Sequence, residues 1–239
     1  MSDPRWWWLP EARVSTVQEI REALARMREL LSDEWNPTVE GARDVLVDRV
    51  RGLPAGEHDA LAAIFAETCG PARESSANAM VPDAIVIGLL QRRHRDQVPV
   101  PPSAGPIAHR IMCDAAFVAW LRLQALELVA VLDHPERDEW MRAAVRDPVL
   151  RRSAAYHVVV EGLVGPAEIE ALLTDPHDVV RARTMVALVD RGTRQGLASV
   201  VEIALARAAP RSLEAWRRKQ AQEILAVNRS VFVAPGGAC

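Results

Sequence analysis

Apolar residues recur along this chain at intervals of three and four positions, the spacing that places them on one face of an α-helix. The first clear segment opens at Ser15 or Thr16, and it ends at Asn36-Pro37; Ser15 and Gln18 fit a capping box. Its apolar positions are Val17, Ile20, Leu24, Met27 and Leu31. No segment alternates apolar and polar residues between hairpin turns, so the pattern predicts an all-α fold without a β-sheet.

Three further helices are predicted in the first part of the chain, over 38–50, over 57–68, and from 81 to the polar run QRRHRDQ. Paired antiparallel, the four helices would make residues 15–97 a helical N-terminal part of two hairpins. Residues 1–14 precede this part as a tryptophan-rich N-terminal arm.

A proline-rich segment, 98–106, follows with four prolines and a glycine, which excludes a helix interior and predicts an extended connector. Residues 108–132 carry apolar side chains on most faces, as expected of one helix buried on several sides. A return helix is predicted over 137–146. The helical part is expected to run from 107 to 230, and the tail, 231–239, to fray.

Residues 147–192 repeat themselves with a period of thirty positions, and a weaker copy lies around Leu121-Arg122. A fixed period in this range is typical of stacked helical repeats, in which each unit buries its apolar face on its neighbour. The aligned pairs are Leu150-Arg151 with Val180-Arg181, Ala154 with Thr184, Val158 with Leu188, and Gly162 with Gly192.

The unit LLTDPHDVVRARTMVALVDRG, residues 172–192, resembles a HEAT-like repeat of the short bacterial type, and the resemblance is best over 107–209. It implies a right-handed stack of antiparallel helix pairs, a HEAT-like α-solenoid. In such a unit the aspartate, here Asp175 or Asp178, caps a helix or pairs with an arginine of a neighbouring unit.

The arginines and glycines of the repeat are expected to be structural. Arg151 and Arg181 would form a ladder of hydrogen bonds between units, although contact with a ligand or partner stays open for them. Gly162 and Gly192 would each end a helix in the left-handed region of backbone conformation.

Composition and net charge indicate a folded protein and disfavour nucleic acid as its partner. Apolar residues make up 49% of the chain and charged residues 26%, which indicates a folded protein. The net charge of -3 lacks the basic excess of most nucleic-acid-binding proteins, so nucleic acid is not the expected partner, although a local basic face stays open.

The cysteines favour neither a disulfide framework nor a zinc site. Cys69, Cys113 and Cys239 have no CxxC spacing and no neighbouring histidine ligands, so two buried thiols and one terminal thiol are expected, with no metal and no cofactor. No apolar run reaches the roughly 20 residues of a membrane span, and no signal peptide is recognised, which predicts a cytoplasmic protein.

The favoured function is a non-catalytic scaffold or adaptor that binds a protein partner through its solenoid surface. Tryptophan and arginine are enriched at the energetic centres of protein interfaces. The simpler alternatives are that the tryptophans lie in the core or cap the helical stack, and that the arginines are solvated. The candidate partner-binding residues are Trp6, Trp7, Trp8, Trp140, Arg151, Arg152, Trp216 and Arg217.

Two other functions stay open. Bacterial DNA glycosylases that act on alkylated bases are built from HEAT-like repeats in chains of about this length, so the resemblance admits that activity. Asp114, Trp120 and Arg122 would then be the catalytic candidates. The other alternative is a toxin-neutralising immunity protein. The sequence contains no GxSxG, HExxH, P-loop or dinucleotide glycine pattern.

Overall fold

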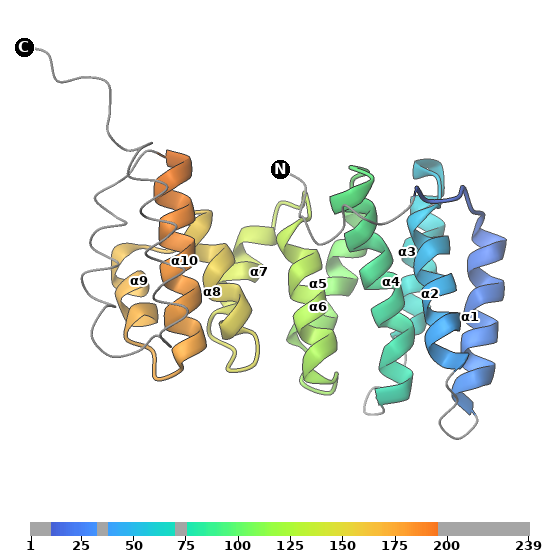
Figure 1. Ribbon diagram of the computed structural model, residues 1–239, viewed down its shortest axis with the longest axis horizontal. Coiled ribbons are helices and arrows are strands. Elements are labelled where there is room, and N and C mark those ends of the chain that lie inside the picture. Colours follow the sequence, from blue (N-terminus) through green and yellow to red (C-terminus); the bar gives the residue numbers. More distant parts are fainter. Residues whose placement is uncertain (1–10, 33–37, 70–75, 196–239) are drawn as a thin grey trace, which may run out of the picture. The chain divides into compact units, whose positions relative to one another are not determined.

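The computed structural model describes residues 11–32, 38–69 and 76–195, and within these ranges it contains ten α-helices, two 3₁₀ turns and no strand (Figure 1). The predicted all-α class is therefore confirmed for this part of the chain. The residues divide into two compact units, one up to Trp140 and one from Met141 onward. Trp6, Trp7, Trp8, Trp216, Arg217, Cys239 and the tail lie outside the described residues.

The first unit holds α1 to α6 and the first half of α7. Helix α2 packs on α1 and α4, and α6 packs on α4 and α5. The core of these contacts is apolar and closed to solvent, and it includes Ile20, Met27, Leu46, Val50, Ile85, Leu89, Ile111 and Leu126. The helices are α1 (Val17–Ser32), α2 (Thr38–Arg51), α3 (His58–Thr68), α4 (Ser76–Arg95), α5 (Gly105–Cys113), α6 (Ala119–Ala130) and α7 (Arg137–Ala144).

Thr16 and Glu19, one position after the predicted pair, form the capping box of α1. The Glu19 amide donates to Thr16 Oγ1 at 3.2 Å, and the Thr16 amide donates to Glu19 Oε2 at 2.9 Å. Ser15 is buried instead, and its hydroxyl donates to the backbone carbonyl of Arg49 at the end of α2. Ser15, predicted to cap the helix with Gln18, therefore links the start of α1 to α2.

Two predicted boundaries are wrong, and both lie in segments that contain proline. Helix α4 begins at Ser76 and contains Pro82, so the proline does not mark its start. The segment 98–106 is not extended throughout, since Pro102–Ala104 is a 3₁₀ turn and α5 starts at Gly105. Pro106 lies in the first turn of α5, where its missing amide hydrogen has no partner to lose, whereas Pro82 lies inside α4.

The long apolar segment 108–132 is two helices rather than one. Helix α5 ends at Cys113, and α6 begins at Ala119 after a tight turn. The carboxylate of Asp114 accepts the Ala116 amide at 2.9 Å, a local bond that competes with helix continuation. Both helices are apolar, so the hydrophobic pattern alone did not reveal the turn between them.

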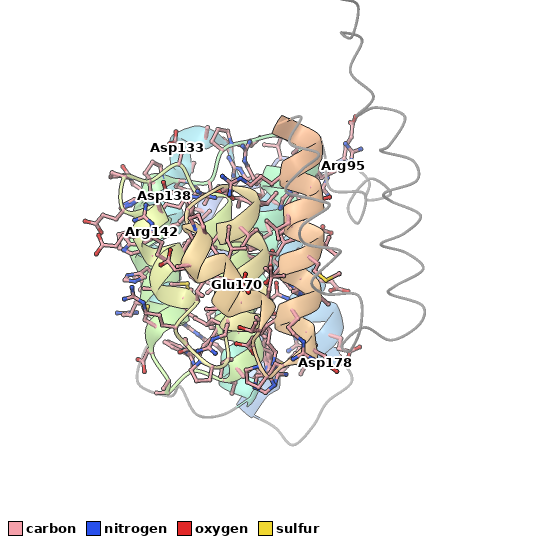
Figure 2. The ribbon with its side chains drawn as sticks, turned by 90° about the vertical axis from the view of Figure 1, so that its left-hand side faces the viewer. Arg95, Asp133, Asp138, Arg142, Glu170 and Asp178 are labelled. Atoms are coloured by element: carbon pink, nitrogen blue, oxygen red, sulfur yellow. The ribbon has the colours of Figure 1, made fainter. Side chains whose placement is uncertain are left out.

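The second unit contains the end of α7 together with α8 (Arg151–Val160), α9 (Pro166–Leu173) and α10 (Asp178–Gln195). Helix α10 packs on both α8 and α9. Figure 2 shows Glu170 on α9 and Asp178 at the end where α10 begins. The buried residues of this unit include Ala154, Val158, Leu172, Val180 and Leu188.

One of the two predicted glycine C-caps is confirmed. Gly162 has a φ of +74°, and the Leu163 amide donates to the Val158 carbonyl at 2.8 Å, closing the end of α8. The expectation for Gly192 is wrong, because α10 continues past it to Gln195.

Candidate functional site

The turns inside the helix pairs α5–α6, α7–α8 and α9–α10 share one construction. In each turn an aspartate Oδ1 accepts the amide of the second residue after it, which folds the chain back between the helices. These bonds join Asp114 to Ala116 at 2.9 Å, Asp147 to Val149 at 2.8 Å, and Asp175 to His177 at 2.8 Å.

An arginine follows each of these aspartates and covers the carboxyl end of the first helix of its pair. Arg122 Nε donates to the backbone carbonyl of Met112, and Arg151 Nε donates to that of Val145, each at 2.9 Å. Arg181 Nη1 donates to the backbone carbonyl of Asp175. The carbonyls at a helix end lack intrahelical partners, so the guanidinium satisfies them.

The predicted bond between neighbouring units of the repeat is also present. Arg151 Nη1 donates to Asp175 Oδ2 at 2.9 Å, which links the start of α8 to the turn before α10. The structural expectation for Arg151 is confirmed, and its side chain is one third exposed. Arg152 is exposed, and the other candidate arginine, Arg217, lies outside the described residues.

Trp140 does not lie at a surface that could bind a partner. Its side chain is buried, with 6% of the residue exposed, and its indole stacks with two imidazoles. The ring centroids of His109 and His134 are 4.4 Å and 4.5 Å from that of Trp140, with interplanar angles of 6° and 24°. We call this arrangement the three-ring stack. The partner-binding prediction for Trp140 is therefore corrected, because the short α7 turns this side chain toward α5.

The three residues considered for glycosylase chemistry belong to the α5–α6 turn and the start of α6, but they have different environments. Arg122 is 4% exposed, and its Nε is committed to the Met112 carbonyl. Asp114 shapes the turn. Trp120 is 40% exposed on the first turn of α6.

Trp120 belongs to an exposed apolar surface that sequence reasoning did not assign to partner binding. We call it the tryptophan patch, and its other members are small side chains on the same turn. The thiol of Cys69 is buried as expected, whereas Cys113, expected to be buried, is exposed within the patch. The patch consists of Cys113, Ala115, Ala116, Ala119 and Trp120.

A polar cleft of about 590 Å³ lies in the first unit, between the end of α4 and the turn that joins α6 to α7. Gln97, two residues after the end of α4, has a φ of +57°, and its side chain donates to the His94 carbonyl at 2.7 Å. Figure 2 shows Asp133 in the turn and Asp138 on the first turn of α7. The charged and imidazole side chains that line the cleft are Arg93, His94, Asp133, His134, Arg137 and Asp138.

Arg137 and Asp138 form an ion pair in the wall of the cleft. Arg137 donates through Nε and Nη2 to the Ala130 carbonyl at 3.0 Å and 2.6 Å, and through Nη1 to Asp138 at 2.9 Å. This guanidinium therefore closes the end of α6 and neutralises a neighbouring carboxylate. His134 belongs both to the cleft and to the three-ring stack.

Burial lowers the pKa of His109 below its ordinary value, while the nearby carboxylates of Glu136 and Glu139 raise it and His134 lowers it. Burial is the largest of these effects, so the neutral imidazole is favoured in the stack. The polar runs QRRHRDQ and DHPERD are the sequence signals for this region, but nothing in their spacing brings them together.

In the part of the chain that the structure covers, no cluster of three or more His, Cys, Asp or Glu side chains is arranged to hold a metal ion. None of the helices in the described ranges is long and apolar enough to cross a membrane. A comparison with known protein families, with characterised proteins and with solved structures found no match.

Proposed function

We propose that this protein is a non-catalytic helical-repeat scaffold or adaptor of HEAT-like architecture that binds a protein partner through the tryptophan patch. The observation that carries the proposal is the 40% exposure of Trp120 among exposed small apolar side chains. Large apolar groups gathered at a surface are typical of interaction sites.

The repeated turn construction supports the architecture. Three successive helix pairs use an aspartate to fold the turn and an arginine to close the preceding helix. A right-handed stack of such pairs would present the turns in a row, as repeat proteins do. The α5–α6 turn would then be one of a series, distinguished by its tryptophan.

The exposed part of Trp120 is large enough to act as an interface anchor. A tryptophan side chain buries up to roughly 250 Å², so a 40% exposed indole leaves on the order of 100 Å² to be covered. At about 25 cal/mol per Å², covering that area contributes roughly 2 kcal/mol. This is the size of effect found at interface hot spots.

No observation on the described residues favours the glycosylase alternative. The guanidinium of Arg122 is buried on a backbone carbonyl, so it does not reach a phosphate without leaving the core. The net charge of -3 gives no general attraction to DNA.

Affinity capture from the organism that encodes the protein tests the proposal, followed by a direct binding measurement with the purified partner. Trp120→Ala should weaken binding by about 30-fold, the equivalent of roughly 2 kcal/mol. Val186→Ala is the matched control, because Val186 is 41% exposed but lies on α10.

A folded Trp120→Ala variant that binds its partner as tightly as the wild type would refute the proposal. Release of an alkylated base from a DNA duplex by the purified wild-type protein would instead favour the glycosylase alternative.

A further inference from the structure

One wall of the polar cleft is the turn between α6 and α7, residues 131–136, and several contacts hold it in place. Leu132 is 5% exposed. A Cβ atom at Gly105 would lie 3.1 Å from His134 Cδ2 and 3.4 Å from Leu132 Cδ1, so the turn packs closely on the start of α5. The guanidinium of Arg137 closes the end of α6 beside the turn. This wall is therefore held by α5, α6 and α7 together.

The opposite wall is the last turn of α4 and the residues that follow it. Gln97 has the left-handed φ of +57°, which glycine adopts without steric cost and other residues rarely adopt. Its side-chain amide donates to the His94 carbonyl, and the Val98 amide donates to the Arg92 carbonyl at 3.2 Å. Hydrogen bonds therefore fix the backbone on this side, and a fixed site loses less entropy when a ligand binds.

Two opposite charges line the cleft without neutralising each other. Arg93, half-buried on the last turn of α4, makes no hydrogen bond or ion pair with any residue that the structure describes. The same holds for Asp133, which is exposed in the turn (Figure 2). Their neighbours Arg137 and Asp138 differ, because they form an ion pair at 2.9 Å. The cleft therefore offers one guanidinium and one carboxylate to a ligand.

The chemistry of these two groups selects a ligand with one anionic and one cationic end. A guanidinium binds a carboxylate through paired N–H donors, and Asp133 accepts the N–H donors of an ammonium. A purely anionic ligand would be repelled by Asp133, and a purely cationic ligand by Arg93.

The lining of the cleft narrows the class of zwitterion further. A quaternary ammonium has no N–H donor and is recognised by aromatic faces, but no Trp, Tyr or Phe is among the described residues that line the cleft. A primary ammonium fits the carboxylate instead. The volume of about 590 Å³ lies within the range of small-molecule sites.

We propose that the polar cleft binds a free α-amino acid, with its carboxylate on Arg93 and its ammonium on Asp133. Val131, Leu132 and Pro135 offer apolar contacts to its side chain. Water reaches both charged groups, so each ion pair contributes little and the dissociation constant is in the millimolar range. This site is independent of the partner proposed for the tryptophan patch.

NMR titration of the full-length protein with each of the standard amino acids tests the proposal. At least one amino acid should shift the backbone amide signals of residues 93–97 and 131–138 in a saturable way. Its carboxamide, which lacks the carboxylate, and its N-acetyl derivative, which lacks the ammonium, should each bind about tenfold more weakly or worse.

Variants of the two charged residues test the contacts themselves. Arg93→Gln and Asp133→Asn should each raise the dissociation constant of that amino acid by about tenfold or more. Arg152→Gln and Asp59→Asn are the charge-matched controls, because both residues are exposed and neither lines the cleft. The controls should leave the dissociation constant unchanged.

Absence of saturable shifts at these residues for every amino acid would overturn the proposal. Equal binding of the amino acid and its two derivatives, or wild-type affinity in both cleft variants, would overturn it as well. Thermal unfolding checks that Arg93→Gln and Asp133→Asn are folded. Should one variant fail to fold, the other variant and the two derivatives decide.

Discussion

The guanidinium of Arg151 is bonded to the carboxylate of Asp175 across 24 positions of sequence, with Nη1 2.9 Å from Oδ2. The same guanidinium donates from Nε to the carbonyl of Val145 just after α7. One side chain therefore joins the end of α7, the start of α8 and the turn before α10. Asp175 is 5% exposed, so this ion pair is largely shielded from solvent on the carboxylate side.

Replacing Arg151 by methionine should lower the free energy of unfolding by about 2 kcal/mol, because it leaves a buried carboxylate without its arginine. The partial exposure of Arg151 keeps the loss below that of a fully buried pair. Chemical denaturation measures the change. Arg152→Met is the matched control, since its side chain is exposed, and equal losses in the two variants would contradict the role of Arg151.

Two helical glycines should respond in opposite directions to replacement by alanine. A Cβ at Gly88 on α4 would lie 2.7 Å from the Cβ of Val50 on α2, so Gly88→Ala should destabilise the protein by about 1–3 kcal/mol. A Cβ at Gly41 on α2 meets no atom within 4 Å, so Gly41→Ala should stabilise it by about 0.5–1 kcal/mol. Thermal or chemical denaturation compares the two, and loss of stability at Gly41 or none at Gly88 would disagree with the packing of α2 on α4.

The two tryptophans of the first unit should contribute very differently to folding. Trp140→Ala should lower the free energy of unfolding by about 4 kcal/mol, since it removes the centre of the three-ring stack. Trp120→Ala should lower it by less than about 2 kcal/mol, because 40% of that residue is already exposed. Equal losses of unfolding free energy in the two variants would contradict the burial of Trp140 and the exposure of Trp120.

The buried carboxylate of Asp83 should make stability depend on pH. Asp83 accepts two hydrogen bonds from Arg43, at 3.0 Å and 2.7 Å, but burial is the larger effect and raises the pKa of Asp83 above its ordinary 3.8. A carboxyl whose pKa is higher in the folded state binds its proton more tightly there. Its contribution is full below the unfolded pKa and is lost as the pH rises through the folded pKa.

The stability of the wild type relative to Asp83→Asn should therefore fall as the pH rises from about 3.8 through the folded pKa of Asp83. Urea denaturation at a series of pH values measures this difference. A difference that grows with pH would contradict the sign derived from burial.

The sequence pattern predicted the helical class and several structural contacts of the repeat. The Arg151 bond to Asp175 and the left-handed Gly162 were foreseen, because both depend on residue types at fixed positions in a short segment. Such local rules need no knowledge of distant packing.

The sequence did not predict three features, and the reason is common to them. These are the different exposure of Trp120 and Trp140, the turn at Asp114 and the polar cleft. Each depends on which helix face meets which neighbour, and apolar residues cover most faces of α5 and α6. Trp140 has the residue type of an interface anchor, but it is buried and stacks with His109 and His134. No spacing in the sequence joins residues 109, 134 and 140.

Partner binding at the tryptophan patch is tested most directly by photo-crosslinking from position 120 in cells of the organism that encodes the protein. A photoreactive phenylalanine analogue replaces Trp120 in one variant and the similarly exposed Val186 in the other. The account predicts one discrete protein adduct from position 120 that is absent from position 186. No adduct from position 120 in a folded variant, or the same adducts from both positions, would contradict it.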